Sequence, residues 1–254
     1  MTQPITVWAT PSGPNPYKAS APSAIHVLRL GIPYKITSIR FEDVKKPPLT
    51  DVNPNGRTPA IQDPNTNLTL WESGAIINYL IEKYDTANRI SYASFNEKHL
   101  LNQWLHFQMS GQGPYYGTAA WFRVVHNEKI EYCIDRYTDQ VKRVLGVLDR
   151  WLEGKRWLVG DKMTYADMAW VPWHEQLHRS IGTEFEDRFD GFPNVKAWHE
   201  RMASRPAWQK CIEIRDKLMD EQKLDWNGMP KGTTSFSEYE KKIKEDAEAV
   251  LKAD

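Results

Sequence analysis

Two short polar runs in the first third of the chain carry residues that could bind a small charged ligand. The first run, residues 53–61, contains Thr58-Pro59. An X-Pro bond is the only peptide bond that adopts the cis form at low cost. A cis bond would turn the backbone N–H and C=O of Thr58 outward, where they can pair with the backbone of a bound peptide. In the second run, Glu72 and Ser73 precede an apolar helical stretch. Unpaired N–H groups collect at such a helix start and can hold a carboxylate, while Glu72 can hold an ammonium group.

The elements that position these runs alternate between strands and helices up to about residue 88. Apolar periodicity, β-branched runs and the helix-ending Gly31 define them. We expect, in chain order, a strand at 5–8, a helix at 23–30, a strand at 34–40, a hairpin of 59–61 with 68–70, and a helix at 74–84. This order, βαβ followed by ββα, resembles a thioredoxin-like domain.

After a linker at residues 85–91 the chain is predicted to be almost entirely helical. Apolar residues recur at steps of three and four between residues 134 and 152, which predicts one long amphipathic helix. Ser237 and Glu240 could cap a last helix. That helix either docks across the cleft between domains or belongs to a charged tail, and we favour docking. The predicted division is 1–87, 92–225 and a C-terminal extension at 226–254.

Composition excludes several classes of function. The 254 residues include 33 basic and 33 acidic side chains, so no net field attracts nucleic acid or an anionic membrane. Two cysteines form no disulfide framework and fit a reducing cytoplasmic setting. The first residues lack the pattern of a signal peptide, and no apolar run is long enough to span a bilayer.

Together, residues 53–61 and 70–77 resemble the glutathione-binding half-site of the cytosolic glutathione S-transferases. Residues 12–18 and 103–122 are similar to the fungal nitrogen-regulator-like class, whose yeast member is prion-like, and to the bacterial nu class. The resemblance covers roughly residues 5–215. It implies an α/β thioredoxin-like N-terminal domain, an all-α helical-bundle C-terminal domain, glutathione as cofactor and a homodimer.

The resemblance also assigns roles within the glutathione site. The backbone of Thr58, before Pro59, would pair with the cysteinyl residue, and Glu72 and Ser73 would bind the γ-glutamyl end. The class often uses a histidine for the glycyl carboxylate. Here the matching positions are Lys45 and Lys46, which are either carboxylate partners or solvated surface lysines; their sequence position cannot separate the two.

The chemistry that such a site supports is activation of a thiol. A free thiol has a pKa of about 8.5, and lowering it by about two units takes roughly 2.7 kcal/mol of preferential interaction with the thiolate. In this class the donor is an asparagine of the first turn, which corresponds to Asn15, with Ser12 and then Tyr17 as the alternatives. Asn15 could also be a simple turn residue between two prolines. An insertion at residues 19–23 predicts that the first helix begins at Pro22, which could displace the turn.

A hydrophobic co-substrate is expected between the domains, facing the bound thiol. Aromatic residues near the first loop and in the first long helix could line its site, although residues at these spacings are often core residues. Tyr115 and Tyr116 stand beside Pro114 and glycines, which favours a position facing the ligand. The candidate wall residues are Trp8, Pro11, Phe107, Tyr115, Tyr116, Trp121 and Phe122.

A rival motif, His174-Glu175-Gln176-Leu177-His178, has the H-E-x-x-H form that presents two histidines to zinc on a helix. We expect it inside a helix that Thr164 and Asp167 cap, just after a kink at Pro172. The sequence downstream offers no third-ligand signature, so we predict no metal. The cap is expected to be structural.

Three functions therefore remain open. The first is a glutathione S-transferase that adds the thiolate to a bulky hydrophobic electrophile, in detoxification or in tailoring a secondary metabolite. The second is a glutathione-dependent cis–trans isomerase of a secondary metabolite, in which glutathione adds to a conjugated alkene and then leaves. The third is a non-catalytic regulatory or binding protein, as the yeast nitrogen regulator is. Product stoichiometry separates the first two, because an isomerase leaves total glutathione unchanged.

Overall fold

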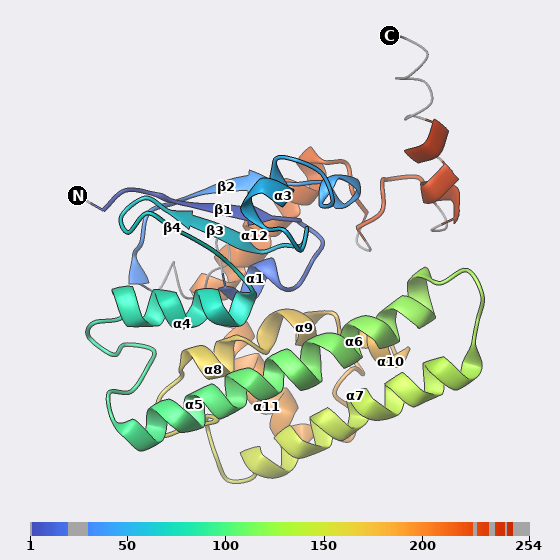
Figure 1. Ribbon diagram of the computed structural model, residues 1–254. Coiled ribbons are helices and arrows are strands. Elements are labelled where there is room, and N and C mark those ends of the chain that lie inside the picture. Colours follow the sequence, from blue (N-terminus) through green and yellow to red (C-terminus); the bar gives the residue numbers. More distant parts are fainter. Residues whose placement is uncertain (1, 20–29, 226–227, 234–236, 242, 246–254) are drawn as a thin grey trace.

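A four-stranded sheet with the order β2-β1-β3-β4 forms the N-terminal part of the computed structural model, which describes residues 2–19, 30–225, 228–233, 237–241 and 243–245 (Figure 1). β1 pairs in parallel with β2 and antiparallel with β3, and β3 pairs antiparallel with β4. Val7, at the centre of β1, stands opposite both Ile36 and Ile61 and is completely buried. The strands are β1 (Ile5–Ala9), β2 (Tyr34–Ser38), β3 (Ala60–Asp63) and β4 (Leu68–Trp71).

Helices cover this sheet and connect its strands. In Figure 1 the helix after β4 lies between the sheet and the helical half of the molecule. Its Ile76, Ile77 and Leu80 are buried at the three- and four-residue spacing of one helix face. The helical elements of this part are α1 (Pro16–Ala19), the 3-10 turn η1 (Phe41–Asp43), α3 (Leu49–Val52) and α4 (Ser73–Tyr84).

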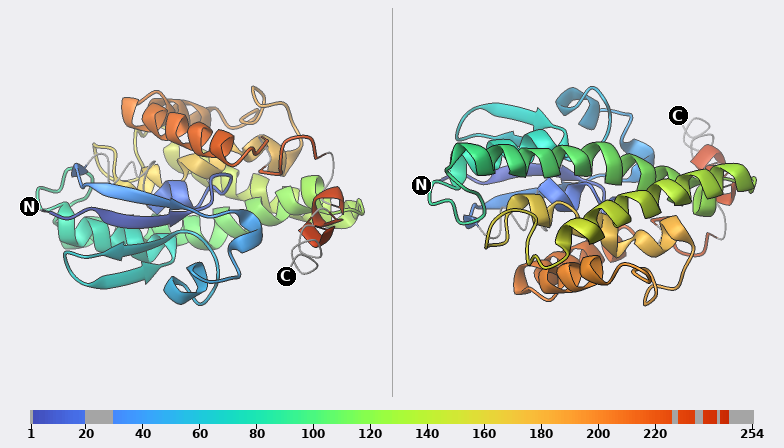
Figure 2. Two further views of the ribbon diagram at one scale, coloured as in Figure 1. Left: turned by 90° about the horizontal axis from the view of Figure 1, so that it is seen from above. Right: turned by 90° about the horizontal axis from the view of Figure 1, so that it is seen from below.

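The helical half begins with one continuous run from residue 95 to residue 125. Ser94 caps its start by accepting the backbone N–H of Glu97. One π-helical turn interrupts the run and a second ends it, and such turns are frequent at functional sites. Figure 2 shows this run beside the long amphipathic helix that follows it. The elements are α5 (Phe95–Phe107), η2 (Gln108–Gln112), α6 (Gly113–Ala120), η3 (Trp121–Val125) and α7 (Glu131–Leu152).

After α7 the structure differs from the expected single helix that Thr164 caps. The cap itself is present: Asp167 accepts the backbone N–H and the hydroxyl of Thr164, each at 2.8 Å, together with the N–H of Leu158 and the indole N–H of Trp198. Asp167 is therefore a structural residue, as predicted. The helix, however, divides into three short segments before the chain closes with two longer ones. These are α8 (Tyr165–Met168), α9 (Val171–Glu175), α10 (Leu177–Ile181), α11 (Pro193–Ala203) and α12 (Pro206–Glu221).

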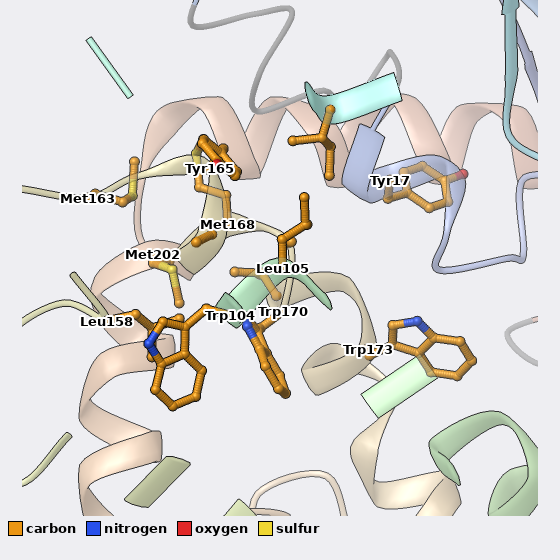
Figure 3. Close-up of a cluster of buried hydrophobic side chains, with 14 of the residues drawn as sticks. Tyr17, Trp104, Leu105, Leu158, Met163, Tyr165, Met168, Trp170, Trp173 and Met202 are labelled. Carbon is orange, nitrogen blue, oxygen red and sulfur yellow. The ribbon is translucent and has the colours of Figure 1, made fainter. Parts of the chain in front are cut away.

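One hydrophobic cluster joins the sheet to the helical half. It runs from Val7 and Tyr17 through Leu80 to the fully buried Trp170 and Trp198. Figure 3 shows the indoles of this core, with Trp173 set apart from Trp104 and Trp170. The predicted α/β N-terminal part and all-helical C-terminal part are confirmed. Because the buried cluster crosses residues 85–91, the domain limits that we expected there stay a proposal.

The start of the first helix differs from the expectation. Residues Pro16–Ala19 already form a helical turn, so helical structure begins directly after Asn15, and the expected start at Pro22 lies outside the described residues. The predicted helix at 23–30 and most of the insertion at 19–23 lie outside the described residues. In the extension, residues 237–241 and 243–245 are helical, and Tyr239 is 4% exposed.

Candidate functional site

Two cavities meet where the turn before α1 faces the helical half. The first, of about 690 Å³, is bordered by ionisable side chains, and we call it the charged cavity. The second, of about 330 Å³, has mainly hydrophobic walls, and we call it the apolar cavity. Gly117, Trp121 and Trp173 border both cavities, so the two spaces adjoin along these residues. Volumes of a few hundred cubic ångströms are typical of sites for small molecules.

Asn15 borders the charged cavity at the end of the turn that leads into α1. Its Oδ1 atom accepts the indole N–H of Trp173 at 3.0 Å. Its backbone carbonyl accepts the N–H of Lys18 at 3.1 Å, which closes the first turn of helix. The side chain is thus held from the helical half and the backbone from α1.

Ser12 and Tyr17, the alternatives to Asn15, lie elsewhere. Ser12 borders the apolar cavity, and its carbonyl accepts the side-chain amide of Gln176 at 3.3 Å. Tyr17 is 3% exposed, and its hydroxyl donates to the carbonyl of Pro11 at 2.5 Å. Burial raises the pKa of Tyr17 far above the usual value. Tyr17 is therefore a core residue and not a thiol activator, so the expectation that it could be the third candidate donor is wrong.

Glu72 and Ser73 stand at the N-terminus of α4 and both border the charged cavity. Glu72 has a φ of 69°, in the left-handed region that non-glycine residues rarely adopt. Its carboxylate is exposed and makes no hydrogen bond or ion pair with the residues that the structure describes. Ser73 is buried, and its hydroxyl contacts Met109 Sδ at 3.4 Å. A free carboxylate and the free N–H groups of a helix start therefore border the same space.

The loop before β3 has the geometry that the sequence motif indicates. The Thr58–Pro59 peptide bond is cis. The Thr58 hydroxyl lies 2.8 Å from the hydroxyl of Thr10, so its side chain ties the loop to the end of β1. The amide of the buried Asn53 donates to the carbonyl of Arg57 at 2.7 Å. Gly56 has a φ of 56°, and a Cβ there would lie 2.6 Å from the carbonyl oxygen of Val44.

The structure does not bring Lys45 or Lys46 to the charged cavity. Lys45 donates to the carbonyl of Asn55 at 2.6 Å, and Lys46 pairs with Asp43 at 3.0 Å. Arg57 does border the cavity, and its side chain makes no hydrogen bond within the described ranges. Arg57 was not among the predicted site residues, although its position directly before Thr58 could have indicated it.

Lys18 is a second cavity residue that the sequence motifs did not indicate. It borders the charged cavity, yet it is 2% exposed, and its Nζ atom donates to Gln108 Oε1 at 3.1 Å. The Nε2 atom of Gln108 donates in turn to Gln112, which donates to the backbone carbonyl of Trp170. Burial lowers the pKa of Lys18 to about 7, and the nearby Glu72 carboxylate opposes this shift.

Of the expected hydrophobic wall residues, two reach the cavities. Trp121 is 43% exposed and borders both, and Phe122 borders the charged cavity. The other five occupy core or packed positions that border neither cavity, which corrects the expectation for them. Trp8 donates to Gln62, Pro11 accepts from Tyr17, Phe107 packs on Trp104 and Trp170, Tyr115 lies beside Arg143, and Tyr116 is fully buried against Trp173.

The C-terminal extension supplies walls of the apolar cavity in addition to η1 and η3. Tyr239 donates its hydroxyl to Glu42 at 2.6 Å, which joins the extension to η1. Gly228 packs directly on Ser12, because a Cβ at Gly228 would lie 2.4 Å from Ser12 Cβ. The hydrophobic walls of this cavity are Phe41, Trp121, Val124, Val125, Trp173, Met229 and Tyr239.

The H-E-x-x-H residues serve packing. His174 is fully buried among aromatic rings, and burial lowers its pKa well below the usual value. Glu175 accepts from His199 at 3.0 Å, and a break at Gln176 separates the two histidines into α9 and α10. Within the described residues, no group of three His, Cys, Asp or Glu side chains could hold a metal ion. Nor is any described helix long and apolar enough to cross a bilayer.

Comparison with known proteins gives consistent matches over most of the chain. The family model for the N-terminal domain of glutathione S-transferase matches residues 25–83, and that for its C-terminal domain matches residues 114–206. The Aspergillus fumigatus glutathione S-transferase-like protein tpcF is 46% identical, over 82% of this chain and 94% of that protein. Glutathione S-transferase 1 of Schizosaccharomyces pombe is 37% identical, over 85% and 98%.

Solved structures with the same fold include complexes with glutathione compounds. The glutathione transferase URE2P6 of Phanerochaete chrysosporium, in complex with oxidised glutathione, has a TM-score of 0.78 at 42% identity, over 84% of this chain and 97% of that one. Ure2p in complex with S-hexylglutathione has a TM-score of 0.75 at 36% identity, over 83% and 98%. The yeast transcriptional regulator URE2 itself is 34% identical, over 82% of this chain and 67% of that protein.

Proposed function

The chain belongs to the glutathione S-transferase family, and we propose that it binds glutathione in the charged cavity and activates its thiol for attack on a hydrophobic electrophile in the apolar cavity. The observation that carries the proposal is the wall that the cavities share. A thiol held beside Asn15 lies next to Trp121 and Trp173, which also border the apolar space.

The charges around the charged cavity match those of glutathione. The γ-glutamyl end carries an ammonium and a carboxylate, which would bind the Glu72 carboxylate and the free N–H groups at the start of α4. The glycyl carboxylate would bind Arg57, which has no other partner among the described residues, rather than Lys45 or Lys46. The cysteinyl backbone would pair with Thr58 at the cis bond.

The reaction that this arrangement supports is nucleophilic addition or substitution by sulfur. Asn15 would donate a hydrogen bond to the glutathione thiolate, which stabilises the anion relative to the thiol. The thiolate then forms a C–S bond with the electrophilic carbon, and the electron pair of that carbon moves into a conjugated system or onto a leaving group. The hydrophobic walls, including Met229 and Tyr239 of the extension, favour a bulky apolar electrophile.

The direct test is native mass spectrometry of the protein with glutathione and a panel of conjugated hydrophobic electrophiles, followed by product analysis. We expect a glutathione adduct of at least one electrophile, with loss of one glutathione for each product formed. An isomerised product at constant total glutathione would replace transfer by isomerisation. Binding of glutathione without any product would indicate a non-catalytic binder, and no binding at all would refute the proposal.

A further inference from the structure

The Lys18 amine occupies an unusual position at the wall of the charged cavity. It stands one helical turn after Asn15 on α1, with its Nζ atom 6.0 Å from the centre of the Trp173 ring. Trp173 in turn holds the Asn15 side chain. Lys18, Trp173 and Asn15 therefore form one contiguous part of the wall, and the Lys18 amine is the basic group in it.

A chain of buried amides fixes the environment of this amine. The backbone carbonyl of Trp170 can only accept, so the N–H₂ group of Gln112 must donate to it. The side-chain oxygen of Gln112 then accepts from Gln108. Gln108 must then present its own oxygen to Lys18. The Lys18 amine thus has one fixed acceptor in either protonation state, and it makes no second hydrogen bond with the described residues although Lys18 borders the charged cavity.

Burial and the charges near Lys18 have opposite effects on the pKa of its amine. Burial disfavours the ammonium form, and the Glu72 carboxylate at the start of α4 favours it, with a resulting pKa of about 7. Arg57 stands on the same cavity as a second cation. Tyr17 on α1 stays neutral because its pKa is raised, and His174 of α9 stays neutral because its pKa is lowered. In η2, Gln108, which accepts from Lys18, and Met109, which borders the same cavity, are both uncharged.

We propose that Lys18 is the internal proton acceptor of the glutathione site, so that its amine takes the proton that the glutathione thiol loses. The proton leaves sulfur and reaches the Lys18 nitrogen, directly or through a water molecule, and converts a neutral thiol and amine into a thiolate and an ammonium. Charge and atoms balance without any further reactant. This inference rests on the proposed binding of glutathione in the charged cavity.

The test compares two quantities when glutathione binds slightly above pH 7: the thiolate formed, from its ultraviolet absorbance, and the protons released to solvent, from a pH indicator. We expect the natural protein to form thiolate while releasing fewer than half as many protons. Lys18→Met and Lys18→Arg cannot accept a proton, so any thiolate that they form should release an equal number of protons. Lys142→Met, a change of an exposed lysine on α7, should behave as the natural protein does.

The possible results distinguish failure of the proposed role of Lys18 from failure of the proposed glutathione site. S-hexylglutathione, which has no thiol, measures proton exchange from all other groups and is subtracted. Equal thiolate and proton release in the natural protein would overturn the role of Lys18, and so would a small proton release that persists in Lys18→Arg. Absence of binding by glutathione and S-hexylglutathione alike would instead refute the glutathione site. Two variants are used because Lys18→Met could fail to fold. Lys18→Arg retains a cationic donor for Gln108 and serves as the test in that case.

Discussion

The Nε1 atom of Trp173 lies 3.0 Å from the Oδ1 atom of Asn15. An indole N–H can only donate, so the oxygen of the Asn15 amide must face Trp173 and its N–H₂ group must point elsewhere. That group makes no hydrogen bond within the part of the chain that the structure describes, although the residue borders the charged cavity. A tryptophan 158 residues away in the sequence therefore fixes which end of the amide a ligand would meet.

We predict that Asn15→Ala raises the pKa of the bound glutathione thiol by roughly one to two pH units, because one hydrogen bond to a charged group contributes about 1.5–3 kcal/mol. Glutathione affinity should change little. Titration of the thiolate absorbance measures the effect. Ser12→Ala is the matched comparison and should have a smaller effect, since Ser12 borders the apolar cavity. A larger rise in Ser12→Ala would transfer the role to the serine.

Trp173→Phe should raise the same pKa by less than Asn15→Ala does. An aromatic ring is kept, but the amide of Asn15 loses the hydrogen bond that orients it and can rotate. Because Trp173 acts through Asn15, adding Trp173→Phe to Asn15→Ala should have almost no further effect on the thiol. A double-mutant cycle of thiolate titrations measures this coupling. Additive effects would mean that Trp173 acts on the ligand independently.

Glu72→Ala should weaken glutathione binding by about 2–5 kcal/mol, because the γ-glutamyl ammonium would lose water without gaining a partner. Isothermal titration calorimetry gives the affinity. Glu82→Ala removes an exposed carboxylate from the other end of α4 and serves as the control. Unchanged affinity in Glu72→Ala would show that the assigned half-site is wrong.

A homodimer is expected from the family resemblance, in which the sheet part of one subunit packs on the helical part of the other. The structure has exposed apolar side chains on both parts: Leu68 and Trp71 on β4, and Phe95 and Leu100 at α5. We predict a dimer by sedimentation velocity at micromolar concentration, and a shift toward monomer in Trp71→Glu. A natural protein that sediments as a monomer would contradict this.

The sequence predicted the elements that follow from local chemistry. Strand β1, the β3–β4 hairpin, α4 and α7 follow from apolar periodicity, and the positions of Thr58 and Glu72 follow from turn and cap residues next to each other in the chain. In these cases the signal and the structure lie within a few residues of each other.

Contacts between distant parts of the chain were not predictable in this way. Tyr116 and Phe107 were expected to be pocket residues, but Tyr116 is fully buried against Trp173 and Phe107 is half-buried against Trp170. Lys18 was not among the candidate residues, because its hydrogen bond in the folded chain is to Gln108, 90 positions later. The proposed role of Arg57 was also missed, because only the folded structure shows that Arg57 borders the charged cavity and that Lys45 donates to the carbonyl of Asn55 instead.

The final prediction concerns stability and pH. The pKa of Lys18 is lowered to about 7 in the folded chain, whereas an unfolded lysine has a pKa near 10.4. Between these values the unfolded state binds more protons than the folded state, so the free energy of unfolding should rise with pH. The contribution of Lys18 is on the order of 2 kcal/mol between pH 7 and pH 9, from about 1.4 kcal/mol per pH unit at most. Below pH 7 the penalty for burying the ammonium is present in full.

Urea unfolding of the natural protein and of Lys18→Met, at several pH values and without glutathione, measures this contribution. The difference in unfolding free energy between the two proteins should change in favour of the natural protein as pH rises from 7 to 9, because Lys18→Met has no amine to titrate. Lys142→Met should show no such change, since its lysine is exposed on α7. A difference that stays constant over this range would mean that Lys18 keeps its proton in the folded chain. The amine could then stabilise a bound thiolate by its charge but could not accept the proton of the thiol.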